Sequence, residues 1–175
     1  MIRSAKEFVE LRTSTNAQEY LRAATEDADP NVWLEVLRDF PEMSVWVVRN
    51  KTVPMEILQR LVFHPDAEVR AEVATKNKLS ADLMNALAAD PDDSVRERIV
   101  YNKNVRQDIL RKLAQDPVVR ISSAAHERLR VSEIDQKWPE FGVTSVSTTI
   151  HSELDIYNSL NQNIWEILWH SAKSL

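Results

Sequence analysis

Apolar residues recur along the middle of the chain at the spacing of short helices. Segments 92–102 and 105–115 each place apolar side chains three to five positions apart, which gathers them on one face of a helix. In a strand they would alternate between two faces. Turn residues such as Asn102 and Asn104 separate the two segments. The pattern therefore predicts a pair of short helices.

This pattern returns every 26 residues. The columns that stay apolar at this offset are Leu61, Leu87 and Leu113; Ile57, Leu83 and Ile109; Leu58, Met84 and Leu110; Val47, Val73 and Ile99; and Val62, Ala88 and Ala114. A small helix pair cannot bury its own apolar face, so successive copies must stack to share one. The sequence predicts an all-α protein, an α-solenoid of short helix-pair repeats with a period of about 26.

A proline column marks where each leading helix should begin. Pro65, Pro91 and Pro117 are 26 residues apart, and Asp90 and Asp116 stand directly before the last two. Proline is tolerated in the first turn of a helix and aspartate is a favoured N-cap. We expect the prolines inside that first turn and the aspartates as its caps.

The repeat pattern fades toward both ends of the chain. We expect a helical repeat array over 1–131 with a degenerate first unit at 1–28, because terminal units of stacked arrays are atypical. Residues 132–151 are expected to form a connector and 152–175 a C-terminal capping helix, all within one domain. After Pro117 the last unit is interpreted as two residues short.

The quoted columns and three Val-Arg pairs, which begin at Val69, Val95 and Val119, resemble the leucine-rich repeat variant family and, more loosely, HEAT-like repeats. The resemblance covers roughly residues 29–131 and implies an α-solenoid without naming an activity. The period is slightly longer than that family's usual unit. Some members carry cysteines upstream; this chain has none, which excludes a cluster-binding role.

Composition removes several classes of enzyme. With 43% hydrophobic and 28% charged residues the chain should fold, but it has no cysteine and a single glycine, Gly142. It therefore lacks a thiol nucleophile, a dinucleotide fingerprint, a phosphate-binding loop and a nucleophile elbow. We expect no catalytic residue and no cofactor. No apolar run is long enough to span a membrane and no signal peptide is evident, so a cytoplasmic location is expected.

The four histidines share no spacing typical of metal ligands. They are His64, His126, His151 and His170. No metal site is expected from them. His64 stands where later units have Asp90 and Asp116, which favours a helix-capping or surface role.

Three arginines, Arg70, Arg96 and Arg120, follow the valines of the Val-Arg pairs and should form a ladder. One interpretation is a clamp for phosphate or carboxylate. The other, which we favour, pairs them with acids on neighbouring helices, such as Glu68, Glu72 and Asp93. Net charge is −5, of which −4 falls on residues 132–175, so the rest of the chain is nearly neutral.

Trp46 is a large aromatic residue in a polar column. It stands opposite Arg96 in one register of the repeat and opposite Glu72 and Arg98 in the other. Tryptophan is enriched at binding hot spots, but Trp46 could equally pack against the irregular first unit. The candidate partner-binding residues are Trp46, Arg70, Arg96, Arg120, Glu72 and Arg98.

These features predict a non-catalytic scaffold for protein–protein interaction, working as an adaptor or an inhibitor. A small acidic protein of this kind is compatible with a bacterial immunity protein that neutralises a basic toxin. The alternative is a HEAT-like nucleic-acid-binding protein, similar to the DNA glycosylases among HEAT-like proteins. That alternative needs a basic concave face, and the near-balance of charge makes nucleic acid an unlikely partner. A purely structural part of a larger assembly is a third hypothesis.

Overall fold

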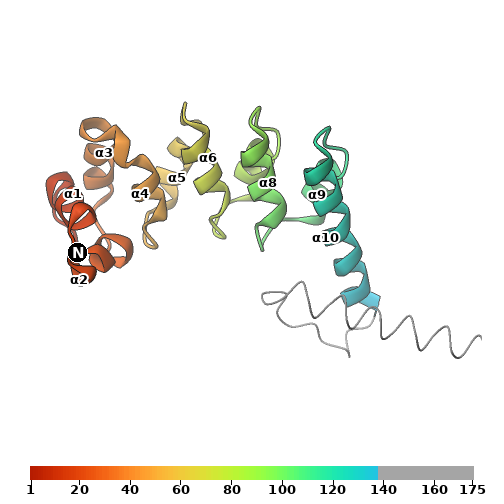
Figure 1. Ribbon diagram of the computed structural model, residues 1–175, viewed down its shortest axis with the longest axis horizontal. Helices are drawn as coiled ribbons and strands as arrows, with labels where there is room; N and C mark the ends of the chain where they lie inside the picture. Colours follow the sequence, from red (N-terminus) through yellow and green to blue (C-terminus); the bar gives the residue numbers. More distant parts are fainter. Residues whose placement is uncertain (138–175) are drawn as a thin grey trace, which may run out of the picture. The chain divides into compact units, whose positions relative to one another are not determined.

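The computed structural model describes residues 1–137, and every regular element among them is helical (Figure 1). The elements are α1 Ala5–Thr13, α2 Ala17–Thr25, α3 Pro30–Asp39, the 3₁₀ turn η1 Pro41–Met43, α4 Ser44–Arg49, α5 Met55–Leu61, α6 Ala67–Ala74, α7 Ala81–Leu87, α8 Asp93–Tyr101, α9 Gln107–Leu113 and α10 Val119–Lys137. The only β-type contact in this part of the chain is an isolated bridge between Ile2 and Ala28. The all-α prediction is confirmed for these residues.

The boundary predicted at residue 131 falls inside a helix. Residues 132–137, expected to open the connector, continue α10 to Lys137. The rest of the connector and the capping helix at 152–175 lie outside the described residues. Met1–Ser132 form one compact unit.

From α3 onward the helices alternate between two rows. Row A consists of α4, α6, α8 and α10, and row B of α3, α5, α7 and α9; Figure 1 shows successive pairs standing side by side. In row A, α4 packs on α6 and α6 packs on α8. Helices of the same row begin 23 to 26 residues apart along the chain.

Residues 26 apart occupy equivalent buried places. Leu61, Leu87 and Leu113, one in each of α5, α7 and α9, are 3%, 1% and 2% exposed. In row A the column of Val47, Val73 and Ile99 is fully buried. These side chains belong to one apolar cluster that extends from Ile2 to Ala125. These two predicted columns therefore lie in the core, whereas Leu83, Ala88 and Ala114 of the other predicted columns are only partly buried against it.

The starts of α6 and α8 differ from the prediction. Their N-caps are Asp66 and Asp92, whose carboxylates accept the backbone N–H groups of Glu68 and Ser94. Pro65 and Pro91 therefore precede the caps and lie outside the first turn. The expected cap residue Asp90 is buried and precedes the actual cap, Asp92. It accepts the Asp92 N–H and also binds a residue of another helix.

The predicted two-residue shortening after Pro117 is also wrong. Ile121 and Ala125 in α10 are fully buried, as are Val95 and Ile99 at the same places in α8. The offset stays at 26, because the core position is filled by Ile121 and not by exposed Val119.

A polar column ties the ends of the row A helices together. Asn50 and Asn102 are buried just after α4 and α8, where an unpaired amide would be costly. The Asn102 side-chain amide donates to the carbonyl oxygens of Ala74 and Lys76, at 2.8 and 3.1 Å, while its oxygen accepts the N–H of Asn104. The amide of Asn50 likewise donates to two carbonyls at the end of α2.

Cationic side chains occupy the equivalent positions of the row A helices that alternate with these two. Lys76 Nζ donates to the Asn50 carbonyl at 3.3 Å, and Arg128 donates to the carbonyls of Val100 and Asn102 at 2.7 and 2.9 Å. Burial lowers the pKa of Lys76 and of Arg128. Each member of this carbonyl-binding column (Asn50, Lys76, Asn102 and Arg128) thus satisfies backbone acceptors of the preceding row A helix or, for Asn50, of α2.

The first helices close the core at the N-terminal end. Phe8 of α1 meets Trp33 of α3 edge to face, with ring centroids 5.2 Å apart, and both side chains are fully buried. Such aromatic pairs add to the stabilisation that comes from buried area alone. The degenerate first unit therefore seals the apolar cluster. No helix among the described residues is both long and apolar enough to cross a lipid bilayer.

We predict that Leu87→Ala lowers the free energy of unfolding by about 2–5 kcal/mol, because it opens a cavity between neighbouring helix pairs. Phe63→Ala is the control, since Phe63 is 76% exposed and its truncation removes little packing. Urea unfolding followed by circular dichroism measures both. Equal losses for the two variants would contradict this description of the core.

We predict that Asn102→Ala destabilises the protein by about 2 kcal/mol, because it leaves buried carbonyl groups without a donor. Exposed Asn77, which has no side-chain partner among the described residues, provides the matched control Asn77→Ala. Thermal unfolding of the two variants is the measurement. A stable Asn102→Ala protein would show that the carbonyl-binding column is dispensable.

Candidate protein-binding site

Two of the predicted ladder arginines form buried ion pairs between neighbouring helix pairs. Arg70 binds both carboxylate oxygens of Asp90 at 2.7 and 2.9 Å, and Arg96 binds those of Asp116 at 2.7 and 3.2 Å. The arginine side chains are 12% and 13% exposed, and their partners 6% and 4%. The pairing interpretation is supported, but the partners of Arg70 and Arg96 are Asp90 and Asp116. Of the acids that we expected, Asp93 pairs with the third arginine, Arg120.

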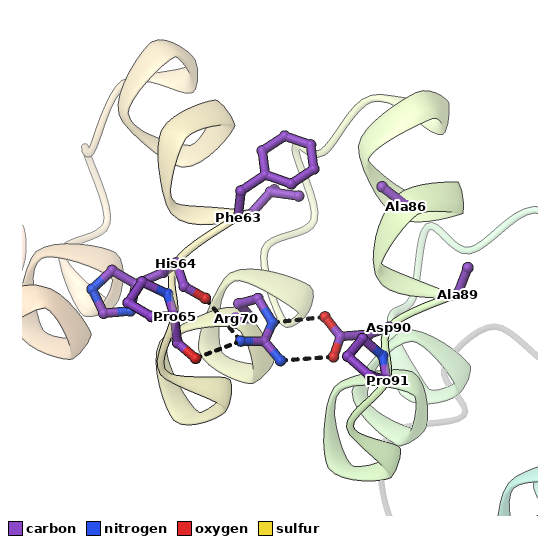
Figure 2. Close-up of a pocket in the computed structure, with 9 residues that line it drawn as sticks. Phe63, His64, Pro65, Arg70, Ala86, Ala89, Asp90 and Pro91 are labelled. Atoms are coloured by element: carbon purple, nitrogen blue, oxygen red, sulfur yellow. Dashed lines mark hydrogen bonds and ion pairs between the residues drawn. The ribbon is translucent and has the colours of Figure 1, made fainter.

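The same arginines also bind backbone carbonyl groups. Arg70 Nη1 donates to the carbonyls of His64 and Pro65 at 2.8 and 2.9 Å, and Arg96 repeats this contact 26 residues later (Figure 2). Each guanidinium has five N–H donors, of which four are used. Arg70 and Arg96 are therefore poorly placed to clamp an added phosphate or carboxylate.

Arg120 does not belong to this ladder. At an offset of 26 the ladder place in α10 falls to Ser122, whose hydroxyl bonds to its own helix backbone. Arg120 is half-exposed and pairs with Asp93 at 2.7 Å and with Glu97 at 3.3 Å, both in α8. The prediction placed it in the ladder because it assumed a shortened last unit.

The other two predicted residues are surface residues of row A. Glu72 in α6 forms an ion pair with Arg49 of α4 at 3.3 Å. Arg98 in α8 is exposed. The structure therefore brings Glu72 of α6 next to α4, the helix of Trp46. Arg98 lies in α8, two helices away from α4 in row A.

An open groove of about 520 Å³ separates α5 from α7. Phe63 stands at its rim, opposite Ala86 and Ala89, and the Arg70–Asp90 pair forms its polar side (Figure 2). Because Arg70 already uses four of its five donors, the groove offers apolar surface and little polar chemistry.

Trp46 lies in a stack of aromatic and guanidinium groups. The Arg12 guanidinium carbon is 3.2 Å from the centroid of the Trp46 ring and 4.0 Å from that of Tyr20. Arg49 lies over the same tryptophan at 4.5 Å. We call Arg12, Tyr20, Trp46 and Arg49 the Trp46 stack. Trp46 is half-buried, so it both packs on the first unit and reaches the surface.

Arg12 has donors that no group in the described part of the chain satisfies. Its Nε is buried without a hydrogen-bond partner, and no carboxylate among the described residues pairs with its guanidinium. Its two terminal nitrogens are not among the buried unpaired atoms, so solvent reaches them. Burial lowers the pKa of Arg12, and the neighbouring Arg49 charge lowers it further.

Sequence reasoning missed Arg12 and Tyr20. Both lie in the degenerate first unit, where no repeat column identifies an unusual residue. The polar column of Trp46 was the one signal that pointed to this region.

The histidines of the described part make backbone contacts and no metal cluster. His64 Nδ1 accepts the N–H of Asp66 at 3.1 Å, the contact that Asp90 and Asp116 make in later pairs. Because the N-cap of α6 is Asp66, the predicted capping role of His64 is wrong. His126 Nδ1 lies 2.8 Å from the Ser122 carbonyl oxygen. Within residues 1–137, no group of three or more histidine or acidic side chains is arranged to hold a metal ion.

Comparison with protein-family models, with curated proteins and with solved structures finds no match to this chain. The resemblance to leucine-rich repeat variants therefore remains a prediction.

We predict that the Arg96–Asp116 pair makes stability fall in acid. The hydrogen bond from Arg96 holds the pKa of Asp116 below its ordinary value, which is about 3.9 in an unfolded chain. A depressed pKa in the folded state stabilises the protein above the unfolded value, and this contribution is lost as pH falls below about 4.

Asp116→Asn should therefore be less stable than the wild type at neutral pH and should lose less stability between neutral pH and pH 3. Asp82→Asn is the control, because Asp82 is exposed and lies in no described ion pair. Urea midpoints across the pH range test this, and identical acid dependence in Asp116→Asn and wild type would contradict it.

Proposed function

We propose that this chain is a short α-solenoid that serves as a non-catalytic protein-binding module, either an adaptor or an inhibitor, and that its partner docks on the Trp46 stack. The observation that carries the proposal is the composition of this surface cluster. Tryptophan, tyrosine and arginine are the residue types most enriched at interface hot spots, and here all three are in contact.

Preorganisation also favours this surface. The aromatic rings hold the Arg12 guanidinium in place before any partner arrives, so binding would immobilise few additional side chains. Long exposed arginines elsewhere lose rotamer freedom when they are bound.

Two other surfaces support the proposal less well. The buried arginines of the ladder have their donors occupied, and the Phe63 groove lacks free polar groups that could select a partner. Nucleic acid is also less suited, because residues 1–131 carry no net positive charge to neutralise phosphates.

We predict that Trp46→Ala and Tyr20→Ala each abolish or strongly weaken capture of a protein partner from the source cell. Hot-spot truncations typically cost about 2 kcal/mol or more, which corresponds to roughly thirtyfold in affinity. Quantitative pull-down with the full chain as bait measures the loss. Tyr20 is 42% exposed, so its truncation should leave the fold intact even if Trp46→Ala is destabilised.

Tyr101→Ala is the matched control. Tyr101 is 62% exposed on α8 and lies outside the Trp46 stack, so its removal should not change partner capture. A partner that is retained by both stack variants, or lost equally with Tyr101→Ala, would refute docking at this site.

A further inference from the structure

We propose that Arg12 is a carboxylate-binding residue, and that the partner places an acidic side chain against the Trp46 stack. This inference rests on the proposed function and adds the chemical class of the group that is recognised. It follows from the contacts of a single guanidinium and the charges around it.

The stacking geometry leaves the hydrogen-bonding edge of Arg12 available. Aromatic rings contact the face of a guanidinium, whereas its N–H donors lie in the plane. The guanidinium carbon of Arg12 lies over the rings of Tyr20 and Trp46, and no hydrogen bond joins Arg12 to either side chain. Because Nε is covered, the two terminal nitrogens form the accessible fork, and a fork of this kind matches the two oxygens of a carboxylate.

The local charge is one positive unit in excess. Arg12 and Arg49 lie over the same indole ring, and in the described part of the chain Glu72 forms an ion pair with Arg49 but none with Arg12. The two guanidinium groups repel each other, and a carboxylate at Arg12 would relieve that repulsion. A basic partner such as the expected toxin would be repelled here and would need a different surface.

A carboxylate fits these observations better than the phosphates of a nucleic acid. A polyanion needs several free cations along a path to release its counterions. Two further arginines of row A are paired: Arg49 with Glu72, and Arg70 with Asp90. One isolated fork suits a single acidic side chain.

The test is a nuclear magnetic resonance titration of the labelled full chain at low ionic strength. The probe is a short capped peptide of alternating glutamate and glycine, and its glutamine counterpart is the neutral control. We expect saturable shifts of the Arg12 Nε–H and Trp46 indole N–H resonances with the acidic peptide only. Inorganic phosphate and a short oligonucleotide form additional arms.

Three variants separate a fork from simple charge attraction. Arg12→Gln should weaken peptide binding by about tenfold or more, as expected when a charge-assisted pair of hydrogen bonds is lost. Arg12→Lys should weaken it as well, because it keeps the charge and loses the fork. Arg98→Gln removes an exposed arginine of α8 and should leave binding unchanged.

The inference is overturned if the glutamine peptide or the oligonucleotide binds as well as the acidic peptide, or if Arg98→Gln weakens binding as much as Arg12→Gln. If the wild type does not bind the acidic peptide while partner capture still depends on Trp46, the carboxylate inference is overturned and the proposed function is not. Specific peptide binding without any Trp46-dependent partner would support Arg12 as a carboxylate site and count against the proposed function.

Discussion

Helices of six to ten residues are marginal in water, because too few hydrogen bonds follow the costly first turn. All seven helices from α3 to α9 are of this length. Their stability must come from the apolar faces that they share with neighbours, and the buried leucines of α5, α7 and α9 are where they share them. A core built this way has no single centre. Each helix pair depends on the pairs beside it.

Shared apolar surface does not fix how far one pair slides or turns against the next, and polar contacts at two levels supply that constraint. One is the bidentate pairing of Arg70 and Arg96 with the aspartates of the following pair. The other is the carbonyl-binding column, in which a side chain from each row A helix satisfies the carbonyls at the end of the helix before it. Buried donors and acceptors tolerate few other arrangements, because an unpaired group would be costly.

The Trp46 stack lies where this regular pattern stops. At the ladder position α4 has Ser44, which bonds to the Pro41 carbonyl within its own turn, so the arginine–aspartate pair is absent there. Contact with the first unit is made instead by Trp46 with Arg12 and Tyr20. A half-buried indole lies here beside an arginine whose buried Nε has no hydrogen-bond partner among the described residues, and this is why the proposed function and the carboxylate site both fall here.

The sequence by itself determined the helical class, the 26-residue spacing and the buried columns, because these follow from where apolar side chains recur. It also indicated Trp46, as an aromatic residue in a polar column. It could not determine the partners of Arg70 and Arg96, because each lies 20 residues further along and is brought near by the packing of the next pair. Only the tertiary structure placed Arg12 and Tyr20 against Trp46, since the first unit follows no column and contacts between distant residues leave no local pattern. The register of α10 was likewise decided by packing, which buries Ile121 where the sequence alone suggested Val119.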